Sequence, residues 1–351
     1  MAFCDILPLT QLEHAFYEIY QKHRAALHYA PEHANLNEFL SLRNAMLPEV
    51  DRLMAAQGHL WHRMPAFAPD ELYETLPGSF RYVPDLCYVR FFPMAQHANE
   101  SYELVLCVEG KNRYYINAQP IDLAAGDVLI LAPYTPQAAG IFESDCIRRN
   151  IVLRRSAVQD RYTMLTSARG SISDFFRRTY DGSIHQAYCL VHCGASLRSN
   201  PLMNLLYSRS PGKTPAEIVY EDSLLTAFLA QLQIAHADRI VTHIQTMDSA
   251  EDQVMNHLRH EFLHLSQAEL ANRFSYSTRQ ILRIVQRHTG MSYQAYVSKL
   301  RMEYIADLLI NSEFPVIQII ESAGYKNNQS FYQQFRQRFG LSPLQYREKN
   351  Q

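Results

Sequence analysis

The sequence predicts a multi-domain α+β protein: a helical N-terminal extension, a small antiparallel β-barrel, a helical linker and an all-α C-terminal region. Near residue 86 the apolar spacing changes from the helical period to the alternation of strands, and near residue 155 it changes back. Near the C-terminus, capping residues and glycines delimit pairs of short helices. We therefore expect domains over residues 1–85, 86–154, 155–247 and 248–351.

The composition is that of a folded protein. Of the 351 residues, 47% are hydrophobic and 19% are charged, which excludes a disordered chain. The net charge is −2, but residues 251–351 carry +3 and the remainder carries −5, so an acidic body precedes a mildly basic tail. With no apolar run of about 18 residues and no signal-peptide pattern, we expect a cytoplasmic protein without a membrane partner. The six scattered cysteines are expected to be free thiols.

The expected secondary structure changes three times along residues 1–247. Residues 1 to about 60 have helical spacing with a break at Ala30-Pro31, and a proline-rich connector follows. Turn signals every 8–12 residues then separate short apolar runs, which is typical of a small barrel or sandwich. The expected strands cover residues 102–108, 113–116, 121–123, 128–131 and 147–153. In the linker we expect a strand over 187–192 and a helix over 218–236.

The tail contains two helix-turn-helix patterns. Ser266 with Glu269 predicts a capping box, and Ser277 begins a second helix that Gly290 ends. After a long helix over residues 293–310 the pattern recurs, with a helix over 316–322, a turn at Gly324, and a helix capped by Asn327 that ends at Gly340. The second helix of such a pair can enter the major groove of DNA.

The exposed faces of both second helices are rich in arginine and amide side chains. A single face of this kind is usually a solvated helix surface. Two in tandem favour DNA binding, because arginine and amide groups make bidentate contacts with base edges.

The tail resembles the DNA-binding domain of AraC/XylS-family transcription regulators. The resemblance rests on Gly324-Tyr325, Gln329-Ser330-Phe331, Phe339-Gly340-Leu341-Ser342-Pro343 and, upstream, Thr289-Gly290-Met291-Ser292. It departs at Ile320, where alanine is usual, and at Gln333, where arginine or lysine is common. The base-reading residues that we expect are Arg279, Gln280, Arg283, Asn328, Gln329, Tyr332 and Gln333, and the expected phosphate contacts are Ser277, Arg287 and Arg336.

Residues 97–141 resemble, more loosely, the cupin-like barrel that precedes this domain in many family members. The matching features are Glu109-Gly110, Leu123-Ala124-Ala125-Gly126-Asp127 and the turn from Pro133 to Gln137. Gln137 stands where a metal-binding cupin has histidine, so we expect neither a metal nor another cofactor. The candidate effector pocket consists of aromatic and basic residues, which suit a sugar or an organic acid: Arg90, Phe92, His97, Tyr102, Tyr114 and Tyr134.

The sequence therefore predicts a regulator that binds double-stranded promoter DNA and responds to a small-molecule effector, and not an enzyme. We expect a homodimer, which contacts RNA polymerase if it activates. The apolar positions of residues 224–234 provide either a dimer face or a face that packs on the barrel. Two alternatives remain: a cupin-type enzyme with an accessory DNA-binding tail, and a regulator without a ligand that is controlled by abundance or by a protein partner.

Overall fold

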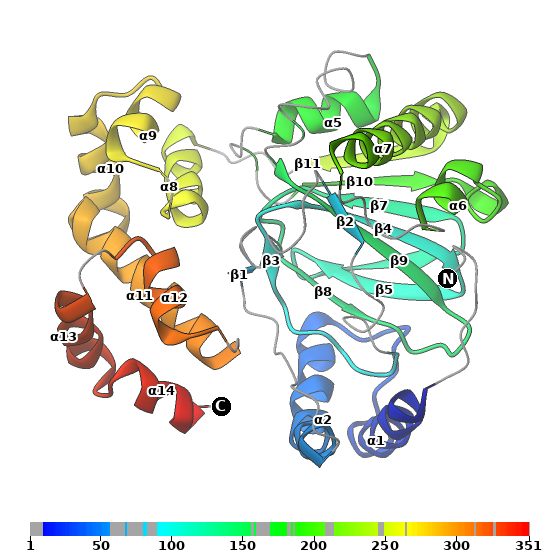
Figure 1. Cartoon of the computed structure of the whole chain (residues 1–351), viewed down its shortest axis with the longest axis horizontal. Coiled ribbons are helices and arrows are strands. Elements are labelled where there is room, and N and C mark those ends of the chain that lie inside the picture. Colours follow the sequence, from blue (N-terminus) through cyan, green and yellow to red (C-terminus); the bar gives the residue numbers. More distant parts are fainter. Residues whose placement is uncertain are drawn as a thin grey trace. The chain divides into compact units, whose positions relative to one another are not determined.

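The computed structural model describes most of the chain, which divides into two compact units (Figure 1). The first unit is residues 1–61 with 68–245, and the second is 62–67 with 246–351. None of the described helices is long and apolar enough to cross a membrane. The predicted proline-rich connector lies largely outside the described residues, which are 10–56, 67–68, 80–82, 90–155, 158, 169–180, 184, 187–207, 214–244, 249–263, 265–311, 314–325 and 328–350.

Two antiparallel sheets form the centre of the first unit. The larger has the order β11 (Ile240–Ile244), β10 (Ala187–His192), β7 (Asp127–Leu131), β4 (Tyr102–Glu109), β9 (Ile147–Leu153) and β2 (Phe80–Tyr82). The smaller has the order β6 (Gln119–Ala124), β5 (Lys111–Ile116) and β8 (Gln137–Gly140), and β1 (Phe67–Ala68) and β3 (Ala98–Asn99) are two-residue strands.

The six strands expected from the sequence are all present, and the predicted fold class is confirmed. Five strands of the described residues were not expected, namely the short β1, β2 and β3, together with β8 and β11. β8 directly follows Pro133 and Pro136, which look like a loop in the sequence. β11 is a half-exposed edge strand in a segment that was expected to be mainly helical.

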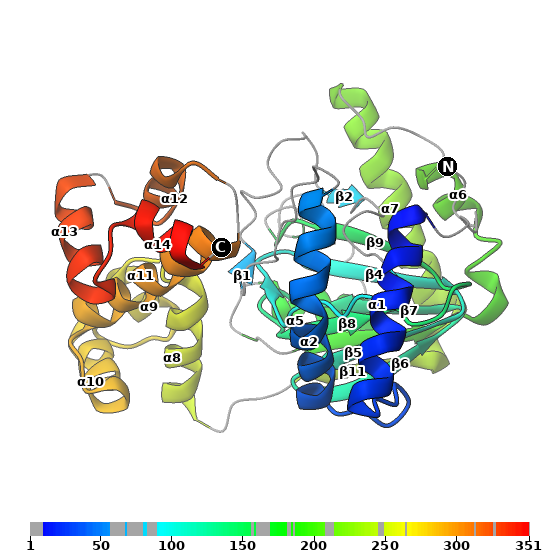
Figure 2. The same cartoon turned by 90° about the horizontal axis from the view of Figure 1, so that it is seen from below.

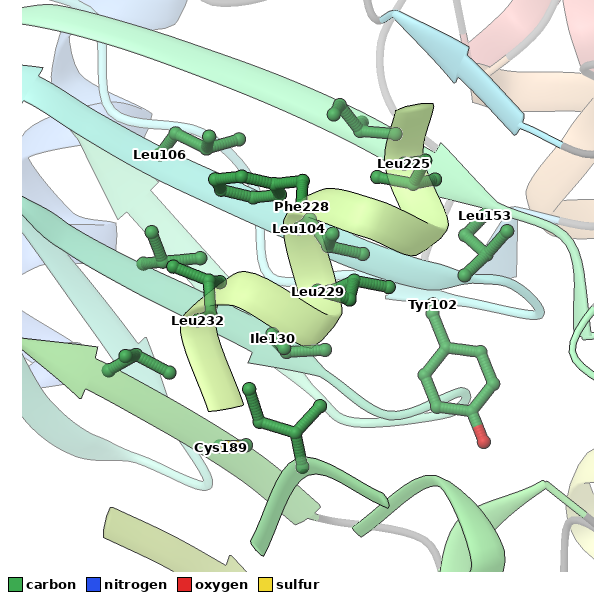
Figure 3. Packing of buried hydrophobic residues seen from close by; sticks show 14 of the residues in the cluster. Tyr102, Leu104, Leu106, Ile130, Leu153, Cys189, Leu225, Phe228, Leu229 and Leu232 are labelled. Atoms are coloured by element: carbon green, nitrogen blue, oxygen red, sulfur yellow. The ribbon is translucent and has the colours of Figure 1, made fainter. Parts of the chain in front are cut away.

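Helices α5 (Ser171–Thr179), α6 (Pro201–Tyr207) and α7 (Pro215–Ala235) cover the outer face of the larger sheet (Figure 1). Leu225, Phe228 and Leu229 of α7 are fully buried against Leu104 and Ile130 of the sheet (Figure 3). Each such side chain contributes about 1.5–3 kcal/mol by burial. These residues therefore pack on the barrel, and the alternative that they form a dimer face is wrong; Ile234, in contrast, is 82% exposed.

The N-terminal helices α1 (Gln11–Leu27) and α2 (Leu36–Ala56) cover the smaller sheet (Figure 2). Phe16 and Phe39 are fully buried in a cluster with Tyr115 and Phe92. The predicted helices and the break between them are confirmed. The first unit is therefore layered, with two helices on one sheet, the barrel interior, and three helices on the other sheet.

The second unit is all helical. It contains α8 (Ala250–Glu261), α9 (Gln267–Arg273), α10 (Thr278–Thr289), α11 (Tyr293–Asn311), α12 (Val316–Ser322), α13 (Asn328–Phe339) and α14 (Pro343–Asn350). Ile281 and Val285 of α10 pack in one apolar cluster, and Phe331 and Phe335 of α13 pack in another. Residues of α11 belong to both clusters, so this helix joins the two modules.

A buried ion pair fastens α1 to the barrel. Arg90 Nε donates to Glu13 Oε1 at 2.8 Å, and Arg90 Nη2 donates to Glu13 Oε2 at 3.0 Å. Burial raises the pKa of Glu13, but the hydrogen bonds from Arg90 and from the Thr10 backbone outweigh it and leave the pKa below its usual value.

Replacing Glu13→Gln should lower the free energy of unfolding at pH 7 by about 2 kcal/mol, because it leaves a buried arginine without its charged partner. Since the pKa of Glu13 is lower in the folded state, this stabilisation is present above the unfolded pKa, near 4.5, and is lost as the pH falls through the folded value. Urea unfolding of both proteins from pH 7 downward measures the difference. Glu18→Gln, on the exposed face of α1, is the control. A difference independent of pH would contradict the assignment.

Candidate DNA interface and barrel interior

The first helix-turn-helix module is defined by reciprocal caps. Ser266 and Glu269 form the predicted capping box at the start of α9. At the start of α10, Gln280 N donates to Ser277 Oγ at 3.3 Å and Ser277 N donates to Gln280 Oε1 at 2.7 Å. Gly290 ends α10 with φ of 70°, which favours glycine. The caps fix both ends of the helix.

The exposed face of α10 carries the predicted arginines. Ile281 and Val285 are fully buried, whereas Arg279 and Arg283 are exposed and have no ion pair within the described part of the chain. Gln280 is exposed too, but its carbonyl oxygen accepts from Ser277, so this side chain also caps the helix. Arg279 and Arg283 therefore have their full donor capacity available to a ligand.

The second module repeats this geometry. Gly324 adopts φ of 80° in the turn after α12, and Ile320 is fully buried. Phe331 and Phe335 anchor the inner face of α13. Its outer face exposes the predicted residues Tyr332, Gln333 and Arg336. Asn328 and Gln329 begin α13, but their side chains are not described, and the predicted cap Asn327 lies outside the described residues.

Arg287, a predicted phosphate contact, is already paired. Its Nη1 lies 2.8 Å from Glu251 Oε1 on α8, and His288 Nε2 lies 3.2 Å from Glu251 Oε2. In the second module Arg338 Nη2 similarly lies 2.9 Å from Glu303 of α11. Sequence reasoning missed the pairing of Arg287, because Glu251 is separated from it by 36 positions and belongs to a different helix.

The six residues of the predicted effector pocket do not line one pocket. Arg90 is paired with Glu13, and Phe92 packs under α1 and α2, so both lie outside the barrel interior. Tyr102 points to the helical layer, where a 2.8 Å hydrogen bond joins its hydroxyl to Thr179 Oγ1.

The remaining three candidates are buried. Tyr134 is 0% exposed, and His97, expected at a surface or pocket, is only 3% exposed with Nδ1 3.0 Å from the Ala95 carbonyl oxygen. Tyr114 is the candidate that belongs to the apolar cluster between the two sheets. The predicted pocket therefore combined a residue that lies between the two sheets with residues that face the helical layers.

The barrel interior instead contains a polar cluster around Glu103. This carboxylate accepts hydrogen bonds from Asn99 Nδ2 at 2.9 Å, from Gln137 Nε2 at 2.5 Å and from Asn150 Nδ2. Glu103, Gln137 and Asn150 are at most 2% exposed. We define these four residues as the Glu103 cluster.

Arg148 adds a positive charge to the same interior. It is opposite Cys107 in the register of β4 and β9, and its Nη1 donates to the Tyr114 hydroxyl at 3.3 Å. Burial raises the pKa of Tyr114 well above its usual value, so this phenol stays neutral.

Charge determines how the amides of the Glu103 cluster are oriented. An ionised carboxylate accepts hydrogen bonds only, so each amide must turn its NH₂ group toward it. The carbonyl oxygens of Asn99, Gln137 and Asn150 then face away, and within the described part of the chain they have no hydrogen-bond partner. A buried acceptor left unpaired costs about 1–3 kcal/mol. The interior therefore favours a molecule that donates hydrogen bonds.

The sequence contains one signal for this cluster. Glu103 interrupts an otherwise apolar strand, which by itself suggests no more than one ligand of an incomplete metal site. Its amide partners come from β3, β8 and β9, and their convergence depends on the folded barrel.

Glu103→Gln should destabilise the protein by about 3 kcal/mol, since an amide in its place would turn a donor toward buried donors. Glu109→Gln, at the half-buried end of β4, is the control and should cost less than about 1 kcal/mol. Chemical unfolding followed by fluorescence measures both. Equal small losses would show that the interior carboxylate is not held by the three amides.

Comparisons with known proteins agree with this architecture. Residues 86–163 match the model of the AraC-like ligand binding domain, and residues 270–349 match a helix-turn-helix domain. The chain is 24% identical to the HTH-type transcriptional activator RhaS of Pectobacterium carotovorum over 72% of its own length and 88% of the relative. It is 20% identical to the Msm operon regulatory protein of Streptococcus mutans over 72% and 86%.

A solved structure is similar over much of the chain. The match with an apo form of a ToxT variant from Vibrio cholerae covers 79% of this chain and 99% of that one, with 13% identity and a TM-score of 0.43. A ligand-binding barrel and a tandem helix-turn-helix domain occur in one chain, a domain composition that resembles AraC/XylS-family regulators; this protein is a ligand-sensing, DNA-binding transcription regulator and not an enzyme.

Proposed function

We propose that α10 and α13 read two successive major-groove segments of an operator, about 34 Å apart. The observation that carries this proposal is the unpaired, exposed state of Arg279 and Arg283, within the described part of the chain, on a helix whose ends are fixed by caps. The proposed base readers are Arg279, Gln280 and Arg283 in the first module and Asn328, Gln329, Tyr332 and Gln333 in the second. The proposed phosphate contacts are Ser277, Arg287 and Arg336.

The effector is proposed to bind between the two sheets of the barrel, beside the Glu103 cluster and Arg148. The carbonyl oxygens of the cluster lack hydrogen-bond partners among the described residues, so they can accept from an effector. Arg148 can donate a hydrogen bond to the same effector. A neutral hydroxylated molecule such as a sugar supplies both donors and acceptors, whereas a carboxylic acid would bring a second negative charge close to Glu103. These contacts favour a sugar over an organic acid.

The regulator is also proposed to act as a homodimer through residues 155–247. Strand β11 is an edge strand of the larger sheet, and its Val241 is 52% exposed. Ile234, at the end of α7, is also exposed. An exposed edge with apolar side chains is suited to pairing with a second copy. If the protein activates transcription, RNA polymerase is its further partner.

Arg283→Ala should weaken binding to the operator by roughly 1–3 kcal/mol and relax discrimination at one base pair. Arg336→Ala should weaken binding to all sequences alike and reduce the slope of log K against log salt by about 0.9, the value for one lost phosphate contact. Fluorescence anisotropy at several salt concentrations measures both variants on operator and shuffled duplexes.

Lys349→Ala removes one positive charge from the exposed C-terminal helix and is the matched control for these two variants. It should change neither the discrimination between operator and shuffled DNA nor the preference for any base pair. If Arg283→Ala loses the same affinity on operator and shuffled DNA, Arg283 is not a base reader.

Glu251→Gln should strengthen binding to any DNA by up to about fivefold and steepen the salt dependence. The substitution removes the charge that holds Arg287, and an exposed ion pair is worth at most about 1 kcal/mol. Glu321→Gln, on the exposed surface of α12, controls for the change in net charge. If Arg287→Ala has no effect in the Glu251→Gln protein, Arg287 makes no phosphate contact even when released.

A further inference from the structure

Two cysteines from different strands meet at one end of the barrel. Cys107 lies on β4, and Cys146 directly precedes β9, its neighbour in the sheet. The register between these strands shifts between Cys107 and Glu109, which places Cys146 beside Gly110 at the end of β4. The backbone is tightly packed here, since a Cβ placed on Gly110 would lie 2.7 Å from Cys146 Cα.

The side chain of Cys107 points into this contact. Its Sγ lies 3.7 Å from the carbonyl oxygen of Gly110, the residue that abuts Cys146. The two thiols are hydrogen-bonded to each other. Both cysteines are free and buried.

The surroundings distinguish the two sulfur atoms. Cys107 is 0% exposed, whereas Cys146 is 6% exposed and follows the exposed residues 143–145. The hydrogen bond from Cys107, assisted by the charge of Arg148, lowers the pKa of Cys146, although burial and the carboxylates of Glu143 and Asp145 oppose this. The pKa of Cys107 is raised by its bond to Cys146 and by burial. Cys146 is therefore the nucleophilic member of the pair.

The other two described cysteines provide an internal contrast. Cys189 and Cys193 are buried in the apolar cluster under α7, and burial raises the pKa of each to about 12. They are four positions apart along one strand and the residue that follows it, which keeps their sulfur atoms beyond the reach of a disulfide.

We propose that Cys107 and Cys146 are a dithiol that a hydroperoxide oxidises to a disulfide, which cross-links β4 to the start of β9. Cys146 is the peroxide-reactive thiol and Cys107 is the resolving thiol. This site is separate from the DNA interface and does not depend on the identity of the effector.

The chemistry is balanced in two steps. The Cys146 thiolate attacks one oxygen of hydrogen peroxide; an S–O bond forms, the O–O bond breaks, and the hydroxide that leaves takes the proton of the Cys107 thiol to give water. The Cys107 thiolate then attacks the sulfenic sulfur, so that the S–S bond forms, the S–O bond breaks and hydroxide leaves. The formal oxidation state of each of the two sulfur atoms rises by one, and the peroxide is reduced to water and hydroxide.

The cross-link would lie next to Arg148, which is opposite Cys107 and donates to the Tyr114 hydroxyl in the barrel interior.

The test uses the full-length protein with Cys4→Ser and Cys87→Ser in every variant, so that only the four described cysteines remain. The reduced protein is treated with hydrogen peroxide, unreacted thiols are alkylated after unfolding, and peptides are identified by mass spectrometry. We expect one Cys107–Cys146 cross-linked peptide, reversed by dithiothreitol, with Cys189 and Cys193 fully alkylated.

Single variants separate the two roles. Cys107→Ser should leave Cys146 as a sulfenic acid that dimedone traps, and Cys146→Ser should leave Cys107 reduced. Cys146→Ala replaces Cys146→Ser if the latter fails to give the circular dichroism spectrum of the parent. Reduced Cys107 and Cys146 in a folded protein after peroxide treatment, or cross-links shared equally among all four cysteines, would overturn the proposal.

Discussion

The larger sheet of the first unit is covered on both faces, and this constraint decides where every residue of its central strands points. Along β4, Tyr102, Leu104 and Leu106 face the helical layer, while Glu103, Val105 and Cys107 face the barrel interior. A strand alternates its side chains, so neighbours in sequence belong to different layers. The separation of helix-packing residues from the Glu103 cluster and the dithiol follows from this alternation.

The second unit presents two helices, α10 and α13, whose outer faces are mainly polar. Each module has its own apolar cluster, and α11 contributes to both. Because burial of Ile281, Val285, Phe331 and Phe335 fixes the rotation of α10 and α13, their polar faces remain available for DNA. The pairing of Arg287 with Glu251 adds a limit, since DNA must compete with a carboxylate of the same unit for that arginine.

The features that the sequence predicted best are those encoded by a few neighbouring residues. The caps at Ser266 and Ser277, the αL turn at Gly290 and the strand over 187–192 need only local chemistry, and the structure contains them all. The effector pocket was predicted poorly, because aromatic character alone does not reveal which face of a strand a residue occupies. Arg90 and Glu13 are 77 positions apart, so the residues around either one do not indicate that the two side chains pair.

If α10 and α13 read base edges, this protein distinguishes its operator from other DNA. The most direct test is a titration of the full-length protein with DNA from upstream of its own gene, against a shuffled duplex, at two salt concentrations and with a panel of neutral sugars present or absent. We predict a specificity ratio of about a thousand or more in at least one of these conditions. Equal, salt-sensitive affinity for both duplexes in every condition would contradict the account, because it would reduce the arginine-bearing faces to a nonspecific basic surface.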